Sequence, residues 1–240
     1  MMRSFLGMRT GLDWPGAGRG MILSEKTALA RARMIEMLER FGPGTAVGWT
    51  GGKDSTVVLA LWREVLREHA AAAPVRALNL DTGCKFPEVL AFRDRLAGEW
   101  GIELHIVRPD VDLVRYPLAV DPVQCCGDLK IRPLNEAVAR LKIPALLTGV
   151  RADENPDRAD RPWLEDHGDH VRGLPILEWT ELDVWTFMVR EAVPWCSLYD
   201  QGYRSLGCMP CTVRSGRGER SGRDSAKEER MGQLRSLGYF

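Results

Sequence analysis

The chain has 240 residues, of which 45% are hydrophobic and 28% are charged, an ordinary composition for a globular protein. This length is enough for one large α/β domain with its own core, or for a domain and a tail. Thirty-three basic residues balance thirty-three acidic ones, so the composition alone does not indicate a nucleic-acid-binding protein. No apolar run approaches the roughly 18 residues of a membrane span, so we expect no membrane segment.

The first 20 residues carry arginines but no apolar block followed by small residues, so they are not a secretory signal. We expect residues 1–23 to be a flexible leader and the protein to be cytoplasmic. Without an export signal, the six cysteines do not suggest a disulfide framework. Their grouping is more informative, because it includes an adjacent pair and a C-x-x-C: Cys84, Cys125, Cys126, Cys196, Cys208 and Cys211.

Apolar periodicity predicts helices that alternate with strands along most of the chain. The expected helices cover residues 24–41, 55–69, 86–100, 131–140 and 181–190, and the expected strands cover residues 46–49, 75–80, 104–107, 144–148 and 174–177. Such alternation implies parallel βαβ units and an α/β fold with a doubly wound, mostly parallel sheet. We therefore predict a nucleotide-binding α/β domain over residues 24–190, with residues 191–240 packed on it as a cysteine-containing C-terminal segment.

Two regions lack this periodicity. Residues 151–171 are polar and irregular, which predicts a mobile substrate loop; a merely solvated loop is the alternative. After Cys211 the composition shifts to Arg, Gly, Ser and Glu, which predicts a flexible tail. Seven basic residues in that tail outnumber four acidic ones, so it is a candidate contact for DNA or a partner protein, or it is simply solvated.

One stretch has the composition of a phosphate-binding turn: Thr50-Gly51-Gly52-Lys53-Asp54-Ser55, between an apolar strand and an apolar run with helical spacing. Glycines let the backbone approach a ligand closely, and the free N–H groups and dipole of a helix start favour an anion. Lys53 adds a cation, Ser55 a hydroxyl, and Asp54 a carboxylate for a metal or an N–H. The alternative is a Gly-rich strand-to-helix turn with no ligand.

Two further polar segments, Asp81-Thr82-Gly83 and Gly149-Val150-Arg151, each follow another predicted strand. Ligands of doubly wound sheets bind beyond the carboxyl ends of the strands, so we expect these three strand ends to form one pocket. The nucleotide-binding residues predicted on this basis are Thr50, Gly51, Gly52, Lys53, Asp54, Ser55, Asp81, Thr82, Gly83 and Gly149.

The cysteines Cys125-Cys126 and Cys208-Met209-Pro210-Cys211 form a second candidate site. Four thiolates can hold tetrahedral zinc or a four-iron four-sulfur cluster. Adjacent cysteines make a poor zinc knuckle but can ligate two irons of one cluster, so the pattern favours an iron–sulfur cluster over zinc. Lys130 would offset the negative charge of such a cluster. Four unrelated buried thiols are the remaining alternative.

The turn at residues 50–55 resembles the SGGKDS signature of the PP-loop ATP pyrophosphatases, with Thr50 where the family usually has Ser. Residues 125–134 and 202–212 resemble the cluster motifs of the assimilatory adenylyl-sulfate reductases. The wider superfamily of phosphoadenylyl-sulfate reductases and sulfate adenylyltransferase small subunits is matched at residues 80–83, 148–151 and 178–185. The resemblance covers residues 48–212 and implies an adenine nucleotide alpha hydrolase-like (PP-loop) fold.

Two departures from the reductases bear on function. Those enzymes end in Glu-Cys-Gly-[Leu/Ile]-His, whose cysteine attacks the sulfate sulfur, but no cysteine follows Cys211 here. Only Cys84 and Cys196 remain as alternative nucleophiles, and a structural role is the other interpretation of both. The ending, residues 218–240, is similar to that of the ATP sulfurylase small subunit, as is the segment 81–86. PP-loop proteins of DNA phosphorothioation systems also combine clustered cysteines with the absence of a reductase tail.

The leading hypothesis is therefore a PP-loop ATP pyrophosphatase, or adenylyltransferase, of sulfur metabolism that cleaves ATP to pyrophosphate and an AMP adduct. ATP would bind with Mg²⁺, and Lys53, Asp54 and Arg151 would be the catalytic residues, since positioning and electrostatics carry most of this chemistry. A cysteine desulfurase or a sulfurylase-type subunit would be the protein partner, and DNA would be involved if the pathway is phosphorothioation.

Two alternatives remain. The first is a [4Fe-4S] adenylyl-sulfate or phosphoadenylyl-sulfate reductase that makes sulfite with thioredoxin as the reductant and Cys84 or Cys196 as the nucleophile. The second is a non-catalytic nucleotide-sensing subunit that activates a partner. For each hypothesis we expect a homo-oligomer.

Overall fold

The computed structural model describes residues 20–239, and within this range the chain forms one six-stranded sheet. The strand order is β3-β2-β1-β4-β6-β5, in which β5 is antiparallel to β6 and the other neighbours are parallel. The strands are β1 (Ala46–Gly48), β2 (Arg76–Leu80), β3 (Glu103–Val107), β4 (Ala145–Leu147), β5 (Leu164–Asp166) and β6 (Val171–Gly173). The predicted α/β fold with a mostly parallel sheet is confirmed. The predicted leader falls almost entirely outside the described residues.

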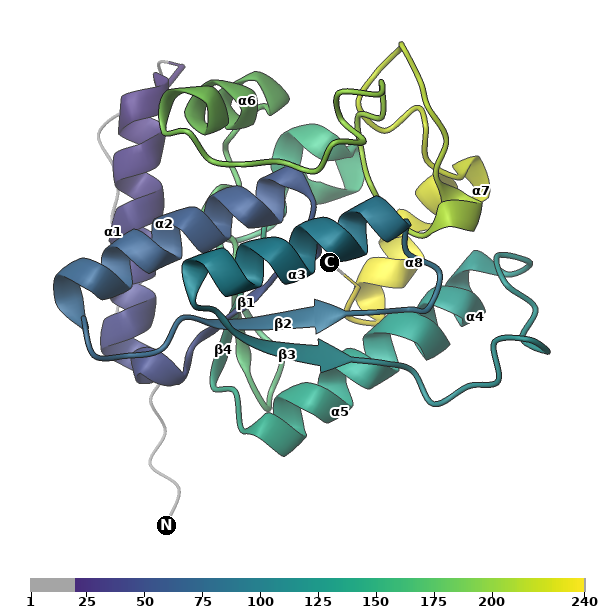
Figure 1. The fold of residues 1–240 in the computed structure, drawn as a ribbon, viewed down its shortest axis with the longest axis horizontal. Helices are drawn as coiled ribbons and strands as arrows, with labels where there is room; N and C mark the ends of the chain where they lie inside the picture. Colours follow the sequence, from purple (N-terminus) through teal and green to yellow (C-terminus); the bar gives the residue numbers. More distant parts are fainter. Residues whose placement is uncertain (1–19, 240) are drawn as a thin grey trace.

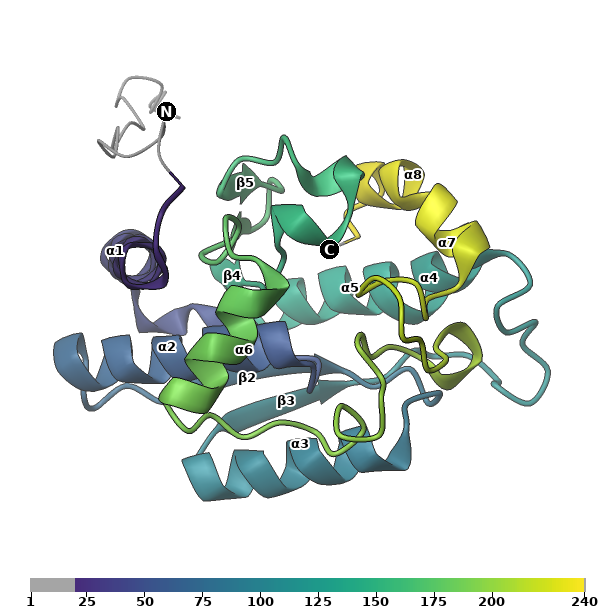
Figure 2. The ribbon, with the colours of Figure 1, turned by 90° about the horizontal axis from the view of Figure 1, so that it is seen from above.

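Helices lie on both faces of this sheet (Figures 1 and 2). They are α1 (Leu23–Phe41), α2 (Lys53–His69), α3 (Pro87–Trp100), α4 (Pro122–Cys126), α5 (Arg132–Leu141), α6 (Glu181–Arg190), α7 (Ser225–Glu229) and α8 (Met231–Ser236). A π-helical turn, η2 (Gly127–Ile131), joins α4 to α5, and short 3-10 turns are η1 (Gly42–Gly44), η3 (Ala152–Glu154), η4 (Pro156–Arg158) and η5 (Met209–Cys211). Among the described residues, no helix is long and apolar enough to cross a membrane.

Two apolar layers hold the sheet in place. On one face α1, α2, α3 and α6 share a continuous core that includes the fully buried Trp49 and Trp62. On the other face α5 packs on the sheet through Leu134, Ala137 and Val138, which recur at helical spacing while polar residues fill the opposite side of the helix. Both faces are therefore covered, as a parallel sheet requires.

The predicted elements agree with the observed ones to within two residues at each end, with one exception. Residues 174–177 were expected to form a strand, but Val171–Gly173 pairs with β4 instead, and Leu174 to Leu177 form consecutive turns. This prediction is wrong because a short apolar run records burial and not backbone conformation. Leu174 and Ile176 are fully buried within the turns. Thr180 caps α6, since its Oγ1 accepts from Asp183 N–H at 3.2 Å.

The prediction of a flexible tail after Cys211 is wrong. Residues in this segment form α7 and α8, and the segment packs against α4. Met231 and Leu234 are buried at this contact together with the stem of Lys227. Composition failed here because a few apolar residues and long basic side chains, which bury their stems, are enough to anchor two short helices.

The polar segment at residues 151–171 is also more regular than expected. It contains the turns η3 and η4 and the strand β5, and its three buried arginines, Arg151, Arg158 and Arg161, form ion pairs. Arg158 pairs with Glu154, and Arg161 forms a two-bond contact with Glu165 at 2.8 and 2.6 Å. The segment is therefore not simply solvated, because internal charge pairing replaces its contacts with water.

Candidate active site

A cavity lies where the strand order reverses between β1 and β4, the usual ligand position in doubly wound sheets. It encloses about 970 Å³, part of which is open to solvent. The structure brings the three predicted strand ends together here, because the turn after β1, Thr82 after β2 and Gly149 after β4 all line it. Five of the predicted site residues do not line the cavity: Gly51, Lys53, Asp81, Gly83 and Arg151.

The turn after β1 depends on two glycines, Gly51 and Gly149. Gly51 has φ +81°, a conformation that residues with a Cβ rarely adopt. A Cβ on Gly149 would lie 2.6 Å from the backbone of Asp54 and Ser55, so β4 ends directly against the first turn of α2. The sequence correctly placed the Gly-Gly pair at a strand-to-helix turn, and the structure shows that Gly149 is its packing partner.

Backbone donors of this turn are already engaged within the protein. The N–H of Lys53 donates to Tyr199 Oη at 2.9 Å, and the N–H of Thr50 donates to Ser55 Oγ at 3.2 Å. Gly52 N–H donates to Thr50 Oγ1 at 3.3 Å. An open anion site would leave such donors pointing at a ligand. Here side-chain oxygens occupy them.

The two predicted catalytic cations are paired as well. Lys53 is 1% exposed and Arg151 is fully buried. Arg151 donates to Asp54 Oδ1 at 2.6 Å and to both oxygens of Glu219 at 2.6 Å, and Lys53 Nζ contacts the same Glu219 carboxylate. Burial alone would lower the pKa of Lys53, but the charges of Asp54, Tyr199 and Glu219 raise it. Burial also raises the pKa of Glu219.

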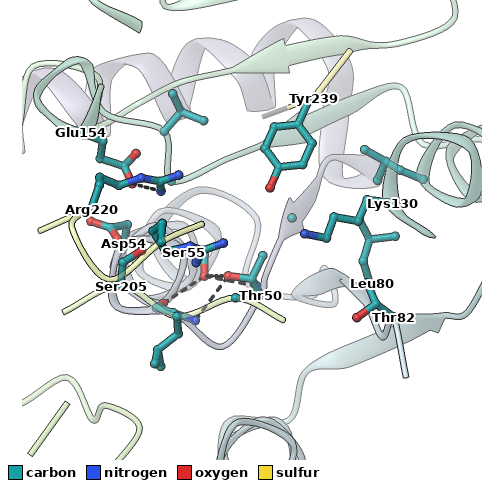
Figure 3. Close-up of a pocket in the computed structure, with 18 of the residues that line it drawn as sticks. Thr50, Asp54, Ser55, Leu80, Thr82, Lys130, Glu154, Ser205, Arg220 and Tyr239 are labelled. Carbon is teal, nitrogen blue, oxygen red and sulfur yellow. Dashed lines mark hydrogen bonds and ion pairs between the residues drawn. The ribbon is translucent and has the colours of Figure 1, made fainter. Parts of the chain in front are cut away.

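A second layer of charge surrounds this pair. Glu154 contacts Arg158 and, at 3.4 Å, Arg220, which also holds Glu228 at 2.6 Å. Burial by itself would raise the pKa of Glu154, but Arg158, Arg220 and Arg151 lower it to about 2. We call this part of the cavity, with residues 50–55, Arg151, Glu154, Glu219 and Arg220, the turn end. Figure 3 shows Asp54, Glu154 and Arg220 gathered on one side of the cavity.

The opposite side, the cysteine end, contains Cys125, Cys126, Cys208 and Cys211. Asp121 caps α4 by accepting from two backbone N–H groups at 2.9 and 3.2 Å, which places Cys125 and Cys126 in a short helix that the sequence did not predict. Cys208 directly precedes the turn η5 and forms a β-bridge with Lys85, and its Sγ lies 3.2 Å from Thr82 Oγ1. All six cysteines are free thiols.

The two cysteine pairs are neighbours in space. Burial raises the pKa of Cys125, and Cys126 and Cys208 raise it further, while Lys130 opposes them. Burial would also raise the pKa of Cys208, but Lys130 and Lys85 lower it to about 6. Elements more than 80 residues apart in sequence therefore share one electrostatic environment, as the cysteine pattern predicted.

The cysteine end has cations without carboxylate partners. In the part of the chain that the structure describes, no ion pair involves Lys85, Lys130 or Arg223, although all three line the cavity. Arg223 is 9% exposed and its buried Nε has no hydrogen-bond partner. The positive charge at this end of the cavity therefore has no carboxylate partner among the described residues, and the groups beside Lys130 that can carry negative charge are the thiols and Tyr239.

Tyr239 completes the cysteine end. Its hydroxyl accepts from Lys227 Nζ at 2.6 Å, and its ring lies 4.4 Å from Lys227 Nζ and 5.5 Å from Lys130 Nζ. Figure 3 shows Lys130 and Tyr239 on the side of the cavity opposite Glu154. Burial would raise the pKa of Tyr239, but Lys130 and Lys227 lower it to about 7.

The two remaining cysteines differ in position. The carbonyl of Cys84 accepts a hydrogen bond from Met209 N–H at 2.7 Å, and burial raises the pKa of the Cys84 thiol, as do the neighbouring Cys208, Cys125 and Cys211. Cys196 is fully buried in the core that α1, α2, α3 and α6 share. Of the two, only Cys84 is beside the site.

Sequence reasoning missed the residues that the C-terminal segment contributes: Glu219, Arg220, Arg223, Lys227 and Tyr239. They have no periodicity and lie in a stretch whose composition predicted flexibility. Only the resemblance of the ending to the ATP sulfurylase small subunit indicated that these residues matter, and it did not place them.

A Gly-Gly turn at the reversal point of a parallel sheet, with a cavity above the strand ends, defines an α/β protein of the PP-loop type. The family model of the phosphoadenosine phosphosulfate reductase domain matches residues 44–214. The chain belongs to this family. Among solved structures, it is similar to a phosphoadenylyl-sulfate reductase from Candida auris, with a TM-score of 0.65, 20% identity, and coverage of 80% of this chain and 96% of that one.

Two curated relatives represent two activities within this superfamily. An adenosine 5′-phosphosulfate reductase of Rhodococcus opacus is 32% identical over 221 residues, which cover 86% of this chain and 88% of the relative. A sulfate adenylyltransferase subunit 2 of Streptomyces lavendulae is 32% identical over 219 residues, which cover 79% of this chain and 67% of the relative.

Proposed function

We propose that the protein is a sulfonucleotide reductase that converts an adenylyl sulfate to sulfite and AMP. The observation that carries this proposal is the positive charge of Lys85, Lys130 and Arg223, which has no carboxylate partner among the described residues and lies beside the cysteine pairs. A sulfonate placed there would be bound by cations and would lie next to thiol chemistry. The similarity to reductases supports the same activity. It replaces ATP cleavage as the leading hypothesis, because the charges of the turn end are satisfied internally.

The four paired cysteines fit an iron–sulfur cluster. Cys125, Cys126, Cys208 and Cys211 would hold it through their thiolates. The ammonium groups of the half-buried Lys85 and Lys130 and of the buried Lys227 suit a thiolate-ligated cluster, because that group carries net negative charge. When bound, the cluster would supply an electrostatic field at the sulfonate. Zinc would have the same ligands but would need the poor knuckle of two adjacent cysteines.

Within this proposal, Arg223 and Lys130 bind and orient the sulfonate, and Cys84 is the nucleophile. A bond forms between the Cys84 sulfur and the sulfonate sulfur while the bond to the bridging oxygen breaks, and the electron pair leaves with AMP. A dithiol protein of the thioredoxin class then attacks the Cys84 sulfur and releases sulfite. Its second thiol frees Cys84, so the dithiol is oxidised to a disulfide while the sulfonate sulfur is reduced.

Cys84 is preferred over Cys196 on position. Thr82 and Lys85, on either side of Cys84 in sequence, line the cavity, and Cys84 is 5% exposed. Cys196 is fully buried among apolar side chains of the core. A nucleophile must reach the sulfonate, so the position of Cys84 supports this role.

The test is an anaerobic assay of the iron-reconstituted protein with adenosine 5′-phosphosulfate and reduced thioredoxin. Sulfite and AMP are expected in equal amounts from the wild type and from Cys196→Ser, and none from Cys84→Ser. Mass spectrometry of the wild type without thioredoxin should find a sulfonate on Cys84. No sulfite from the wild type would overturn the proposed function, whereas activity in Cys84→Ser would overturn only the assigned nucleophile.

A second candidate is adenylyl transfer from ATP to sulfate, which the similarity to a sulfate adenylyltransferase subunit 2 favours. Asp54, Glu154 and Glu219 present oxygens within 4.8 Å of one another, a cluster that could take up Mg²⁺ with the phosphates of ATP. A sulfurylase-type partner subunit would then be required. Release of pyrophosphate from ATP and sulfate, with and without such a subunit, tests this candidate separately from sulfite formation.

A further inference from the structure

We propose that Glu219 is a specificity residue whose carboxylate takes the place of a phosphate in the Gly-Gly turn and so excludes nucleotides that carry β- and γ-phosphates. The admitted ligand, an adenylate with a single nucleotide phosphate, rests on the proposed function. The exclusion itself rests on the geometry of the turn end.

Glu219 binds both cations that a phosphate would need. Its two oxygens each accept from Arg151 Nη2 at 2.6 Å, and one of them also accepts from Lys53 Nζ. A carboxylate that faces a guanidinium and an ammonium is a close chemical analogue of a bound phosphate oxygen pair. The side chain of Glu219 is 8% exposed, so these bonds lie in a site that water barely reaches.

The backbone of the turn gives the same indication independently. Thr50, Gly52 and Lys53 direct their N–H groups at Ser55 Oγ, Thr50 Oγ1 and Tyr199 Oη. A nucleotide phosphate would have to displace these oxygens as well as Glu219. The turn therefore keeps the shape of a phosphate site while both its cations and three of its amides are occupied by the protein.

Charge adds a further barrier. Lys53, Arg151, Arg158 and Arg220 belong to one connected set of ion pairs with five carboxylates, those of Asp54, Asp153, Glu154, Glu219 and Glu228. The set therefore has one carboxylate more than it has cations. A pyrophosphate group would bring more negative charge against Asp54, Glu154 and Glu219, whose oxygens lie within 4.8 Å of one another, and like charges at such a distance repel strongly in a buried site.

The segment that carries Glu219 is fixed at both ends. Val213 N–H donates to the Gly222 carbonyl at 2.8 Å, Thr212 bridges to Arg223, and Arg220 holds Glu228. Glu219 therefore lies on a closed hairpin-like loop and not on a free end. The loop that places Glu219 at the turn end also places Arg223 at the cysteine end.

The experiment uses inorganic pyrophosphate as the probe, measured by isothermal titration calorimetry on the full chain with EDTA and then with Mg²⁺. The wild type should show no binding at 1 mM pyrophosphate (about the weakest affinity that calorimetry resolves). Glu219→Gln keeps the shape of the side chain and removes its charge, so it should gain at least about tenfold in pyrophosphate affinity. Glu178→Gln is the matched control, because Glu178 forms a two-bond pair with Arg33 away from the cavity.

Tight pyrophosphate binding by the wild type, with or without Mg²⁺, would overturn the proposal, and so would a folded Glu219→Gln protein with no gain. If Glu219→Gln does not fold, the wild-type titration and the shorter Glu219→Asp decide: Glu219→Asp withdraws the carboxylate and should gain affinity in the same direction. These arms need neither sulfonucleotide nor turnover, so their failure is distinguishable from a failure to make sulfite.

Discussion

Both ends of the cavity contain several cations, but the cations are paired with carboxylates at one end and not at the other. At the turn end, Lys53 and Arg151 are fully buried and each is paired with Asp54 and Glu219. At the cysteine end, Lys130 and Arg223 line the same cavity and form no ion pair with any carboxylate of residues 20–239. Charges that are paired within the chain help to hold the fold together, whereas cations without a carboxylate partner are available to a bound anion. We therefore expect the turn end to contribute mainly to stability and the cysteine end to bind the ligand.

The largest effect is expected from removing a thiol of the cysteine end. Cys208→Ser should abolish the visible charge-transfer absorption of the reconstituted iron–sulfur group and lower sulfite formation by about a thousandfold or more, since the ligand set becomes incomplete. Cys196→Ser, in the core, should retain both signals. Anaerobic absorption spectra and sulfite assays of the two variants check this. Equal loss in both variants would mean that the cysteine end holds no such group.

At the turn end, we expect the largest effect on the free energy of unfolding from a change of Glu154. Its folded-state pKa of about 2 lies below the ordinary value of 4.5, so its contribution is fully present above pH 4.5 and is lost as the pH falls towards 2. Glu154→Gln should therefore lower the free energy of unfolding by about 3 kcal/mol at pH 7.

The difference between wild type and Glu154→Gln should shrink steadily between pH 4.5 and 2. Urea denaturation at several pH values measures this difference directly. The opposite contribution of Glu219, whose pKa is raised, is present in both proteins and therefore cancels in the difference. A difference independent of pH would show that Glu154 does not owe its low pKa to Arg158 and Arg220.

A matched pair of lysine variants tests the comparison most directly. Lys130→Met removes a cation with no carboxylate partner, and Lys53→Met removes a cation with two such partners. Lys130→Met should weaken the binding of adenosine 5′-phosphosulfate by about a hundredfold, the cost of a charge-assisted contact. Lys53→Met should weaken it less than about tenfold, while it lowers the melting temperature more. Calorimetric titration of both variants decides, and the reverse order would place the ligand anion at the turn end.

The sequence predicted one end better than the other for a physical reason. The turn between β1 and α2 is local: six adjacent residues, an apolar strand and an apolar helix are enough to define it. The cysteine pairs could be grouped because their chemistry is distinctive even across 80 residues. Glu219 and Arg223 could not be found in this way, since their roles depend on the position of a loop that contacts Lys53 from 166 residues further along the chain. The strand prediction for residues 174–177 was wrong for a related reason. These residues are buried by partners distant in sequence, and their own sequence has no strand periodicity.

The smallest expected effect concerns the hydroxyl that occupies the turn. Tyr199→Phe removes the acceptor of the Lys53 N–H bond at 2.9 Å, which should lower the free energy of unfolding by about 1 kcal/mol, the ordinary value of one neutral hydrogen bond. Tyr203→Phe is the control, because Tyr203 packs edge-on against Phe86 and its hydroxyl is in no hydrogen bond among the described residues. Urea denaturation compares the two. If Tyr199→Phe is as stable as the control, the Lys53 N–H is free to meet a ligand, and the turn end is more open than its side-chain pairing indicates.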